Sequence, residues 1–446
     1  MGGGVAVFDC DGDARPEILA AGGTSPRLLL RNGGDFAFAP GAFPDIRGTT
    51  GAYPVDIDAD GILDLYVLRV GTDIALKGGP DCAFEDATAA WGIETGDRWS
   101  TAFTAWWEPG DDRSTLAIGH YVDRSDPDGP FEACDGNTIL RPGPRGYMAE
   151  PLEPGFCALS ILAARDARGR PTLRLSNDRH YYVRGGHEQM WDLAERRFLG
   201  PEDGWPNVSL WGMGIASRDL TGDGRPEVML TSMGDQLLQI AEPDGTYSAA
   251  PYTIGTCAQR PFAGGDGRRS TGGHAEFGDV DNDGRPDLFI AKGNVDQMPG
   301  LAMEDPNNLL MQQPDGTFVE AAGPAGLATT DRSRGAALAD LDGDGRLDLV
   351  VVNRRAPLEL WRNVTEGTGH WLALDLRQPG ENPFALGTLV TVEATGLPPQ
   401  TQEVTIGGGH AGSEAGPLHF GLGSATEARG TVTWPAGTTA PRTLPA

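Results

Sequence analysis

One short acidic pattern recurs along the chain and limits what it can fold into. Residues 278–293, GDVDNDGRPDLFIAKG, place four aspartates within nine residues, and an apolar run follows at once. Carboxylates this close repel one another unless a cation lies between them. Acids at positions 1, 3, 5 and 9 of a loop, with glycine at position 6 for the sharp turn, form an oxygen cage suited to Ca²⁺. For a single copy, a solvated acidic turn between two strands is the alternative.

The pattern occurs five times with the same spacing, which favours calcium over a solvated turn. The copies begin at residues 9, 56, 219, 279 and 340. Two of them are imperfect, with Ala14 at the glycine position of the first and Thr221 at position 3 of the third. We expect about five Ca²⁺ ions, one in each loop. The predicted ligands are Asp9, Asp11, Asp13 and Glu17; Asp56, Asp58, Asp60 and Asp64; Asp219, Thr221, Asp223 and Glu227; Asp279, Asp281, Asp283 and Asp287; and Asp340, Asp342, Asp344 and Asp348.

Each loop belongs to a longer repeated unit. A small, glycine-rich strand precedes the loop, a β-rich strand such as DLFIAKG follows it, and two further strands such as NNLLMQQ and TFVEAAGPAGL come next. Between residues 56 and 219 there is room for two more units with eroded loops, and in one of them Arg168 at position 5 is expected to replace the cation. Seven four-stranded units of about 45 to 60 residues predict an all-β, seven-bladed β-propeller, because one unit cannot bury its faces alone. A linear β-solenoid, with shorter and more regular repeats, is the alternative.

These units resemble FG-GAP/VCBS propeller repeats, the type also found in integrin α-chain heads. The resemblance extends from Gly2 to about Val364. The tail, with EVTIGGGHAG and LHFGLGSATEARGTVTWPAG, resembles the ASPIC/UnbV domain that follows such propellers in the cartilage acidic protein family. It departs from the common pattern in GENPFALGTLVTV, which lacks an Asn-Arg-Asp before the turn. The resemblance and the strand alternation imply a propeller over residues 1–367 and a small β-sandwich or barrel over residues 368–446.

The last unit predicts something about the natural protein. It has three strands and none after LWRNV. In propellers an N-terminal strand commonly completes the last blade, so we predict an upstream strand and a signal peptide that this chain lacks. The alternative is an open last blade with an exposed edge. Members of the family are mostly exported, which fits millimolar calcium and permits disulfides, and we expect a secreted or periplasmic protein.

Charge and composition narrow the partners. The formal net charge of −28 argues against nucleic acid, whose binding sites need basic stripes, and five Ca²⁺ ions would still leave about −18. No apolar run approaches the roughly 18 residues of a membrane span. Among the five cysteines, Cys134 and Cys257 fall in polar loops and are the predicted disulfide, whereas Cys10 and Cys157 are expected to face the core.

A ligand site is expected on the propeller face opposite the metal loops. In integrin-like propellers the metal loops share one face, so the connections after the second strands gather on the other. Here those connections are polar and aromatic and should converge around one axis, as in a ligand pocket. The candidate ligand-binding residues are His120, Asn177, Arg179, Trp211, Asn294, Asp296, Asn353 and Arg354.

The segment SNDRHYYVRGGHEQMW is the densest part of that face. In a functional interpretation His180 acts as acid or base, Arg179 clamps an anion and the tyrosines stack on the ligand. In a structural interpretation the segment is a turn whose Asn and Asp cap the backbone. For His274 and Glu276, a buried structural pair is equally open. The candidates for acid–base catalysis are Asp178, His180, Tyr181, His274 and Glu276.

Two functions remain from the sequence. The first is an exported calcium-binding propeller that binds a glycan, a protein or a small molecule without transforming it. The second is an acid–base enzyme of the lyase, dehydratase or cyclase type on the same face, which rests on analogy within the family. Clustered histidines with shifted pKa values in a closed pocket would favour the enzyme, and a flat, open face would favour binding.

Overall fold

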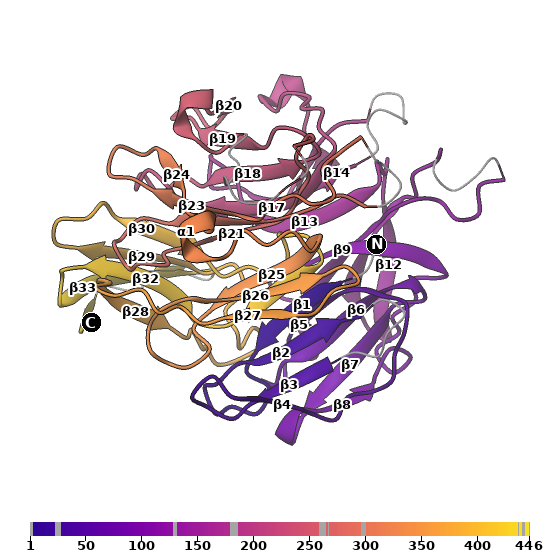
Figure 1. Cartoon of the computed structure of the whole chain (residues 1–446). Coiled ribbons are helices and arrows are strands. Elements are labelled where there is room, and N and C mark those ends of the chain that lie inside the picture. Colours follow the sequence, from indigo (N-terminus) through magenta and orange to yellow (C-terminus); the bar gives the residue numbers. More distant parts are fainter. Residues whose placement is uncertain are drawn as a thin grey trace.

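The computed structural model describes residues 3–22, 28–127, 132–178, 186–257, 265, 267–295, 300–435, 437–438 and 442–445. Strands dominate this part of the chain, and its one α-helix is the four-residue α1 (Ala322–Ala325). The all-β class predicted from the repeats is confirmed (Figure 1).

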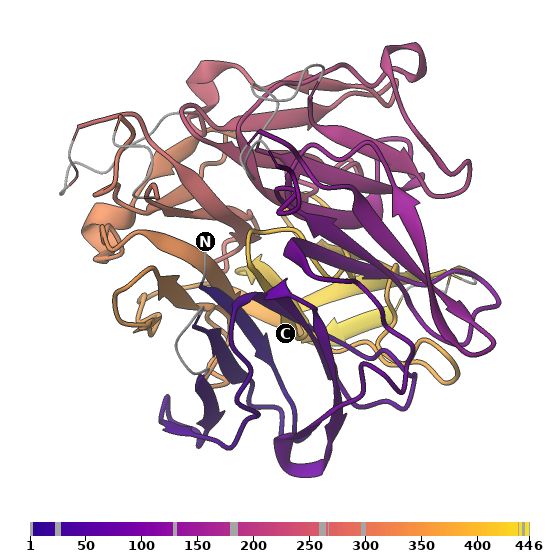
Figure 2. The same ribbon diagram turned by 90° about the vertical axis from the view of Figure 1, so that its right-hand side faces the viewer.

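The strands up to Trp361 form successive antiparallel groups, which follow one another around the molecule in Figure 2. A pairing of Val70 in β6 with Trp99 in β9 joins two groups into one eight-stranded sheet. The groups are β1–β4 (Gly4–Phe8, Glu17–Ala21, Leu28–Asn32, Phe38–Pro40), β5–β8 (Thr49–Val55, Asp64–Gly71, Ile74–Gly79, Ala83–Asp86), β9–β12 (Arg98–Trp106, Thr115–His120, Asn137–Gly143, Gly146–Leu152), β13–β16 (Ala158–Arg165, Pro171–Asn177, Gln189–Asp192, Arg197–Phe198), β17–β20 (Gly212–Arg218, Glu227–Ser232, Leu237–Ala241, Tyr247–Ala249), β21–β24 (Gly272–Gly278, Asp287–Lys292, Asn308–Gln312, Phe318–Glu320) and the three-stranded β25–β27 (Ser333–Ala339, Asp348–Asn353, Glu359–Trp361).

A C-terminal β-unit follows, drawn in yellow in Figure 1. Its strands are β28 (His370–Leu374) paired with β32 (Leu418–Gly423), and β29 (Leu389–Ala394), β30 (Gln400–Glu403), β33 (Glu427–Trp434), β34 (Gly437–Thr438) and β35 (Arg442–Pro445) in a second sheet. Val390, Val392 and Phe420 are completely buried between the two sheets and form the centre of a separate small core.

The segment between β30 and β32 leaves this unit and runs along the axis of the propeller. Its residues pair in turn with first strands of successive groups, Ile406 with β9, Gly407 with β13 and Gly409 with β17. The segment ends in β31 (Gly412–Ala415), which pairs in parallel with β1. The yellow chain among the first strands in Figure 2 follows this course. The C-terminal unit therefore supplies the centre of the propeller.

Small residues in the first strands make room for that segment. A Cβ atom on Gly4 of β1 would lie 2.1 Å from the carbonyl oxygen of Ala411, and one on Gly335 of β25 would lie 3.2 Å from the same oxygen. Backbone this close to backbone requires glycine. The axis explains why the first strand of each unit reads as small and glycine-rich.

The cysteines pair differently from the prediction. Disulfides join Cys10 to Cys82 and Cys134 to Cys157, and Cys257 is free, so the predicted Cys134–Cys257 bridge is wrong. Cys10 and Cys157 are buried as expected, but each belongs to one of the two disulfides. Sequence alone does not reveal that the loop after β1 lies against the turn after β7 of the next group. Two disulfides are typical of proteins that fold in an oxidising compartment.

Within the described residues, no helix is both long and apolar enough to cross a membrane.

Candidate functional site

The five acidic loops lie between the first and second strands of their groups, and their acids shape the loop backbone. Asp279 at position 1 accepts hydrogen bonds from the backbone N–H groups of Asp283 (3.0 Å) and Gly284 (2.7 Å). Asp287 at position 9 accepts from Val280 (3.0 Å) and Gln312 (2.9 Å). Position 6 has a positive φ in every loop, which glycine adopts freely and which Ala14 adopts with φ of 64°.

The hydrogen bonding of the aspartates at position 3 indicates whether these loops fit a cation. The Oδ1 atoms of Asp58, Asp281 and Asp342 are buried, and none has a hydrogen-bond partner among the described residues. Burying a carboxylate oxygen without a partner is unfavourable, and a hard cation with oxygen ligands removes that cost. The residues therefore fit Ca²⁺.

Four of the five loops bring their acids together. Carboxylate oxygens from three acids lie within 4.8 Å of one another in the loops that begin at Asp9, Asp56, Asp279 and Asp340. Burial, followed by the charges of neighbouring aspartates, raises the pKa of Asp64 and Asp279 to about 8. The loop at residue 219 forms no such cluster, because Thr221 replaces the acid at position 3.

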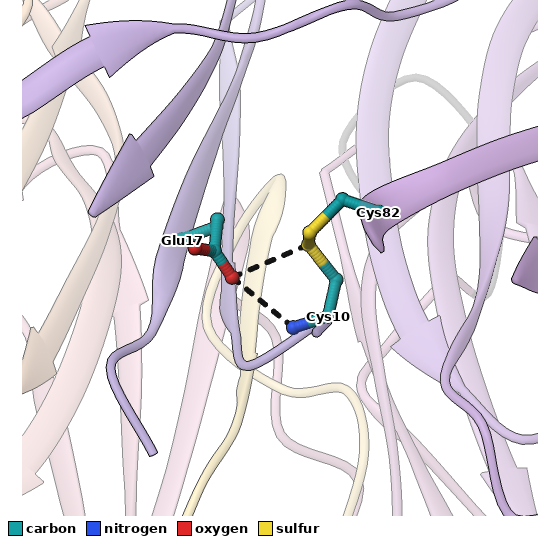
Figure 3. Close-up of side chains that lie close together, drawn as sticks. All are labelled: Cys10, Glu17 and Cys82. Atoms are coloured by element: carbon teal, nitrogen blue, oxygen red, sulfur yellow. Dashed lines mark hydrogen bonds between the residues drawn. A yellow bond between two sulfur atoms is a disulfide. The ribbon is translucent and has the colours of Figure 1, made fainter. Parts of the chain in front are cut away.

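A further group of Cys10, Glu17 and Cys82 resembles a metal site by composition (Figure 3). Its two sulfur atoms are bonded to each other and so cannot act as thiolate ligands. Glu17 is the position-9 acid of the first loop, and its Oε2 accepts a hydrogen bond from the backbone N–H of Cys10 at 3.1 Å. The group is a structural junction between two blades.

The eroded loop between β13 and β14 contains its own cation, but not the predicted one. Arg170, rather than Arg168, pairs with Asp166 through Nε at 2.8 Å. Arg168 reaches the next group and donates to the carbonyl oxygens of Asp203 and Asp244. The prediction for Arg168 is wrong because one step in a loop turns the side chain to another neighbour.

Three residues that were predicted to bind a ligand on the opposite face form hydrogen bonds within the protein itself. His120 is completely buried between the hydroxyls of Ser100 (3.2 Å) and Thr138 (3.1 Å), and burial lowers its pKa to about 3. The Nδ2 groups of Asn177 and Asn353 donate to backbone carbonyls of the following turns, at 2.7 Å and 3.1 Å.

The other predicted residues of that face are only partly placed. Asp178 accepts a hydrogen bond from the hydroxyl of Tyr121. Trp211 immediately precedes β17, and Asn294 and Arg354 closely follow the ends of β22 and β26. Arg179, His180, Tyr181 and Asp296 lie outside the described residues.

His274 and Glu276 lie together on β21, where they contact the axial segment. The backbone N–H of His410 donates to Nδ1 of His274 at 3.1 Å, so the ring proton lies on Nε2 and points to Oε2 of Glu276 at 3.2 Å. Oε1 of Glu276 accepts from the backbone N–H of Leu338 at 3.2 Å. Their proximity was predicted, whereas the contact from His410 was not.

A cavity of about 550 Å³ lies between the first strands, the metal loops and the C-terminal unit. Position-1 acids of four loops lie at its edge. Aliphatic and aromatic side chains make up much of its wall, and Glu276 and His274 line it together with Arg218 and Glu414. Its wall also includes Leu162, Ile215, Leu338, Phe384, Leu386, Ile406 and the loop acids Asp9, Asp56, Asp219 and Asp340.

Burial shifts the pKa values of His274, Glu276 and Glu414 in the direction that favours their neutral forms. Burial raises the pKa of Glu276 to about 8, and burial together with the charge of Glu276 raises the pKa of Glu414 well above its usual range. Burial lowers the pKa of His274 to about 4. Among the described residues, the carboxyl group of Glu414 forms no hydrogen bond. The cavity therefore presents two carboxyl groups, Glu276 and Glu414, beside Arg218.

Sequence reasoning did not find Arg218, Glu414 or His410. Arg218 reaches the cavity from the end of β17, whereas Glu414 lines the cavity and His410 contacts His274 because residues 404–416 enter the axis. The order of the repeats and of the C-terminal domain along the sequence does not indicate that path. The one available signal was the run GGGH, since consecutive glycines mark backbone that something else approaches closely.

Comparisons with known proteins identify both parts of the chain. The family described as FG-GAP-like repeat matches residues 9–67, 219–290 and 279–351, and the family described as ASPIC and UnbV matches residues 378–445. Cartilage acidic protein 1 is 30% identical over 158 residues in Homo sapiens and 28% identical over 158 residues in Mus musculus. These matches cover 34% of this chain and 22% of each relative, so less than a quarter of either relative is represented.

A solved structure agrees with the fold. The BP39L lectin from Burkholderia pseudomallei superposes with a TM-score of 0.52 at 10% identity and covers 80% of this chain and 94% of its own. At that identity the similarity concerns the fold alone. The chain therefore contains FG-GAP-like repeats followed by an ASPIC and UnbV domain.

Proposed function

We propose that this chain is an exported, calcium-stabilised β-propeller that binds a small-molecule ligand in the cavity between its first strands and its C-terminal unit. The observation that carries the proposal is the convergence of Glu276, Glu414 and Arg218 on the wall of one cavity of about 550 Å³, where Arg218 interacts electrostatically with both carboxyl groups. A few ionisable groups on a largely apolar wall are typical of a small-molecule site, where they orient the ligand.

The cavity is a better candidate than the opposite face that the sequence favoured. On that face the ring of His120 and the Nδ2 groups of Asn177 and Asn353 are hydrogen-bonded to their own framework, and only single atoms such as Oδ1 of Asn177 are buried without a hydrogen-bond partner among the described residues. In the cavity, charged side chains converge from β17, β21 and the axial segment onto a volume of about 550 Å³. Cavities of about 300 to 1,000 Å³ with apolar walls and few polar groups are typical of small-molecule sites.

The chemistry of the walls indicates the kind of ligand. Leu162, Ile215, Leu386 and Ile406 provide aliphatic surface, and the carboxyl groups gather near Arg218. Because burial raises the pKa of Glu276 to about 8, its protonated carboxyl group can donate to a hydroxyl or carbonyl oxygen near neutral pH. We expect an uncharged, largely apolar molecule with hydroxyl or carbonyl groups.

A binding experiment with simple probes tests this function. Calorimetry would compare 1-decanol, decanoate and glucose with the full chain and with the Glu414→Gln variant. We expect 1-decanol to bind more tightly than the other two and to lose affinity in the variant, because the amide changes the donor pattern at one position. The matched control is Glu393→Gln, an exposed residue of β29 in the same unit. Equal binding of 1-decanol by all three proteins would rule out the cavity as its site.

The pair His274–Glu276 favours acid–base catalysis as the second candidate. A neutral imidazole donates to Oε2 of Glu276, and the pKa of about 8 makes Glu276 a proton donor at neutral pH. In a dehydration, Glu276 would protonate a leaving hydroxyl, and a second base would take the proton from the neighbouring carbon, so that water is released. If Glu276→Gln retains ligand affinity but loses turnover of every substrate tested, acid–base catalysis is favoured over binding alone. If the substitution leaves turnover unchanged, Glu276 does not have this catalytic role.

A further inference from the structure

The five acidic loops differ in the type of residue at one neighbouring position, which lies on or just after the third strand of each group. The position-9 acid accepts a hydrogen bond from a backbone N–H of that strand in four groups, and from Asn363, two residues after the end of β27, in the fifth, so this part of the chain has an equivalent place beside the acid in all five groups. The bonds run from Asn32 to Glu17 (3.4 Å), Gly78 to Asp64 (2.8 Å), Ala241 to Glu227 (3.3 Å), Gln312 to Asp287 (2.9 Å) and Asn363 to Asp348 (2.7 Å).

The residue just before each N–H donor therefore has an equivalent place beside the loop. In three groups this residue is basic, and each time it pairs with the aspartate at position 3. Lys77 contacts Asp58 and also Asp60 at 2.6 Å. The two remaining pairs are Arg31 with Asp11, and Arg362 with Asp342 at 2.6 Å. These loops already have a positive charge next to position 3.

The loop that begins at Asp279 has no such charge. Met311 occupies the equivalent place, so no basic side chain of the third strand pairs with Asp281 at position 3. Oδ1 of Asp281 has no hydrogen-bond partner among the described residues, but Asp58 and Asp342 share this feature, so it does not distinguish this loop. Arg285 pairs with Asp283 at position 5, but the loops at 219 and 340 have the same arrangement, so this contact does not distinguish them.

The C-terminal unit also holds this loop from outside. The backbone N–H of Gly369 donates to the carbonyl oxygen of Asp281 at 3.0 Å, and that of Gly423 donates to Asn282 at 2.8 Å. Nε2 of His419 lies 2.7 Å from Oδ1 of Asn282. A loop fixed in this way loses less conformational freedom when an ion binds.

We propose that the residue before this N–H donor sets the calcium affinity of each loop, so that the loop beginning at Asp279 binds Ca²⁺ most tightly. Lysine or arginine at that place must be displaced from position 3, and its charge repels the incoming ion. The loops beginning at Asp9, Asp56 and Asp340 then bind more weakly. The loop at 219 has the neutral Ile240 but lacks one carboxylate, and it is also weaker than the Asp279 loop. This inference rests on the proposed calcium binding.

Exchanging charge between two groups tests the inference. The metal-free full chain would be titrated with Ca²⁺ by calorimetry, in competition with a chromophoric chelator. In Met311→Lys we expect the tightest site to weaken by about tenfold or more, because a like charge enters the site. In Lys77→Met we expect one additional tight ion. The exposed controls are Tyr252→Lys and Arg47→Met, which make the same two charge changes. Tyr252 is 70% exposed, and the side chain of Arg47 is 62% exposed.

The outcomes separate this inference from calcium binding itself. If Lys77→Met leaves the number of tight ions unchanged, or if the exposed controls change affinity as much as the loop variants, the inference is wrong and calcium binding stands. If the unmodified chain binds no ion, both fail. If Met311→Lys does not unfold cooperatively in saturating calcium, this variant is not properly folded. The number of tight ions bound by Lys77→Met then tests the inference by itself.

Discussion

Gly4 shows how a single backbone position connects the repeat region of the chain to the axial segment of the C-terminal unit. Its first-strand backbone passes so close to Ala411 that the N–H of the next residue, Val5, donates to the Ala411 carbonyl at 3.1 Å. The contact closes one side of the propeller axis. A side chain on Gly4 would push the axial segment away from β1.

We therefore expect Gly4→Ala to destabilise the protein by about 1–3 kcal/mol, the usual range for overpacking a close contact. Urea unfolding followed by far-ultraviolet circular dichroism measures the change. Gly416→Ala is the matched control, because no heavy atom lies within 4 Å of the added Cβ. Equal stability of the two variants would contradict the close approach.

Glu276 makes stability depend on pH in a defined direction. Its pKa is raised from 4.5 to about 8, so the folded protein holds a proton that the unfolded chain has released above about pH 5. The stabilisation from this proton is complete below pH 4.5 and is lost as the pH rises through 8. The slope across this window is at most about 1.4 kcal/mol per pH unit.

The matched variant for this prediction is Glu276→Gln, which cannot titrate. We expect the difference in free energy of unfolding between the original chain and the variant to shift against the original chain as the pH rises from 5 to 8. A difference that stays constant over this range would mean that Glu276 is already ionised in the folded state.

At the scale of elements, the disulfide between Cys10 and Cys82 connects two blades. It joins the loop after β1 to the turn after β7, and Arg31 spans the same junction by donating to the carbonyl oxygen of Asp81 at 3.1 Å. Both ends lie beside the first acidic loop (Figure 3). The covalent link thus limits the separation of the first two blades in the unfolded chain.

Replacing both cysteines with serine should lower the free energy of unfolding by about 2–4 kcal/mol, because the cross-link closes a long loop. Chemical denaturation under non-reducing conditions measures this loss. Cys257→Ser, which removes the free thiol, should leave stability within about 0.5 kcal/mol. A double variant as stable as this control would show that the bridge is dispensable.

Elements also show where pattern reading succeeded. The period of small strand, acidic loop and β-rich strand located the first and second strands of the units with intact loops, because alternation and turn chemistry act within a few residues. Disulfide pairing failed for the opposite reason. Which loop faces Cys10 depends on how adjacent blades pack, and that contact joins residues 72 apart in sequence.

At the scale of the whole molecule, calcium should act as a distributed clamp. Each ion that binds only the folded state stabilises it by about 2.7 kcal/mol at a hundredfold excess over its Kd. We expect EGTA to lower the Tm and added Ca²⁺ to restore it. Mg²⁺ at the same concentration is the control, because it requires a smaller octahedral site. An unchanged Tm in EGTA would contradict a structural role for calcium.

The sequence by itself determined the all-β class, the repeated unit and the acids that form four clusters, because these properties depend on neighbours within about ten residues. It also identified His274 and Glu276, which share a strand two residues apart. Only the tertiary structure brought Arg218 and Glu414 to them and placed His410 against His274. Arg218 comes close to Glu276 because β17 packs against β21, whereas Glu414 and His410 do so because residues 404–416 enter the axis and pair with strands far away in sequence.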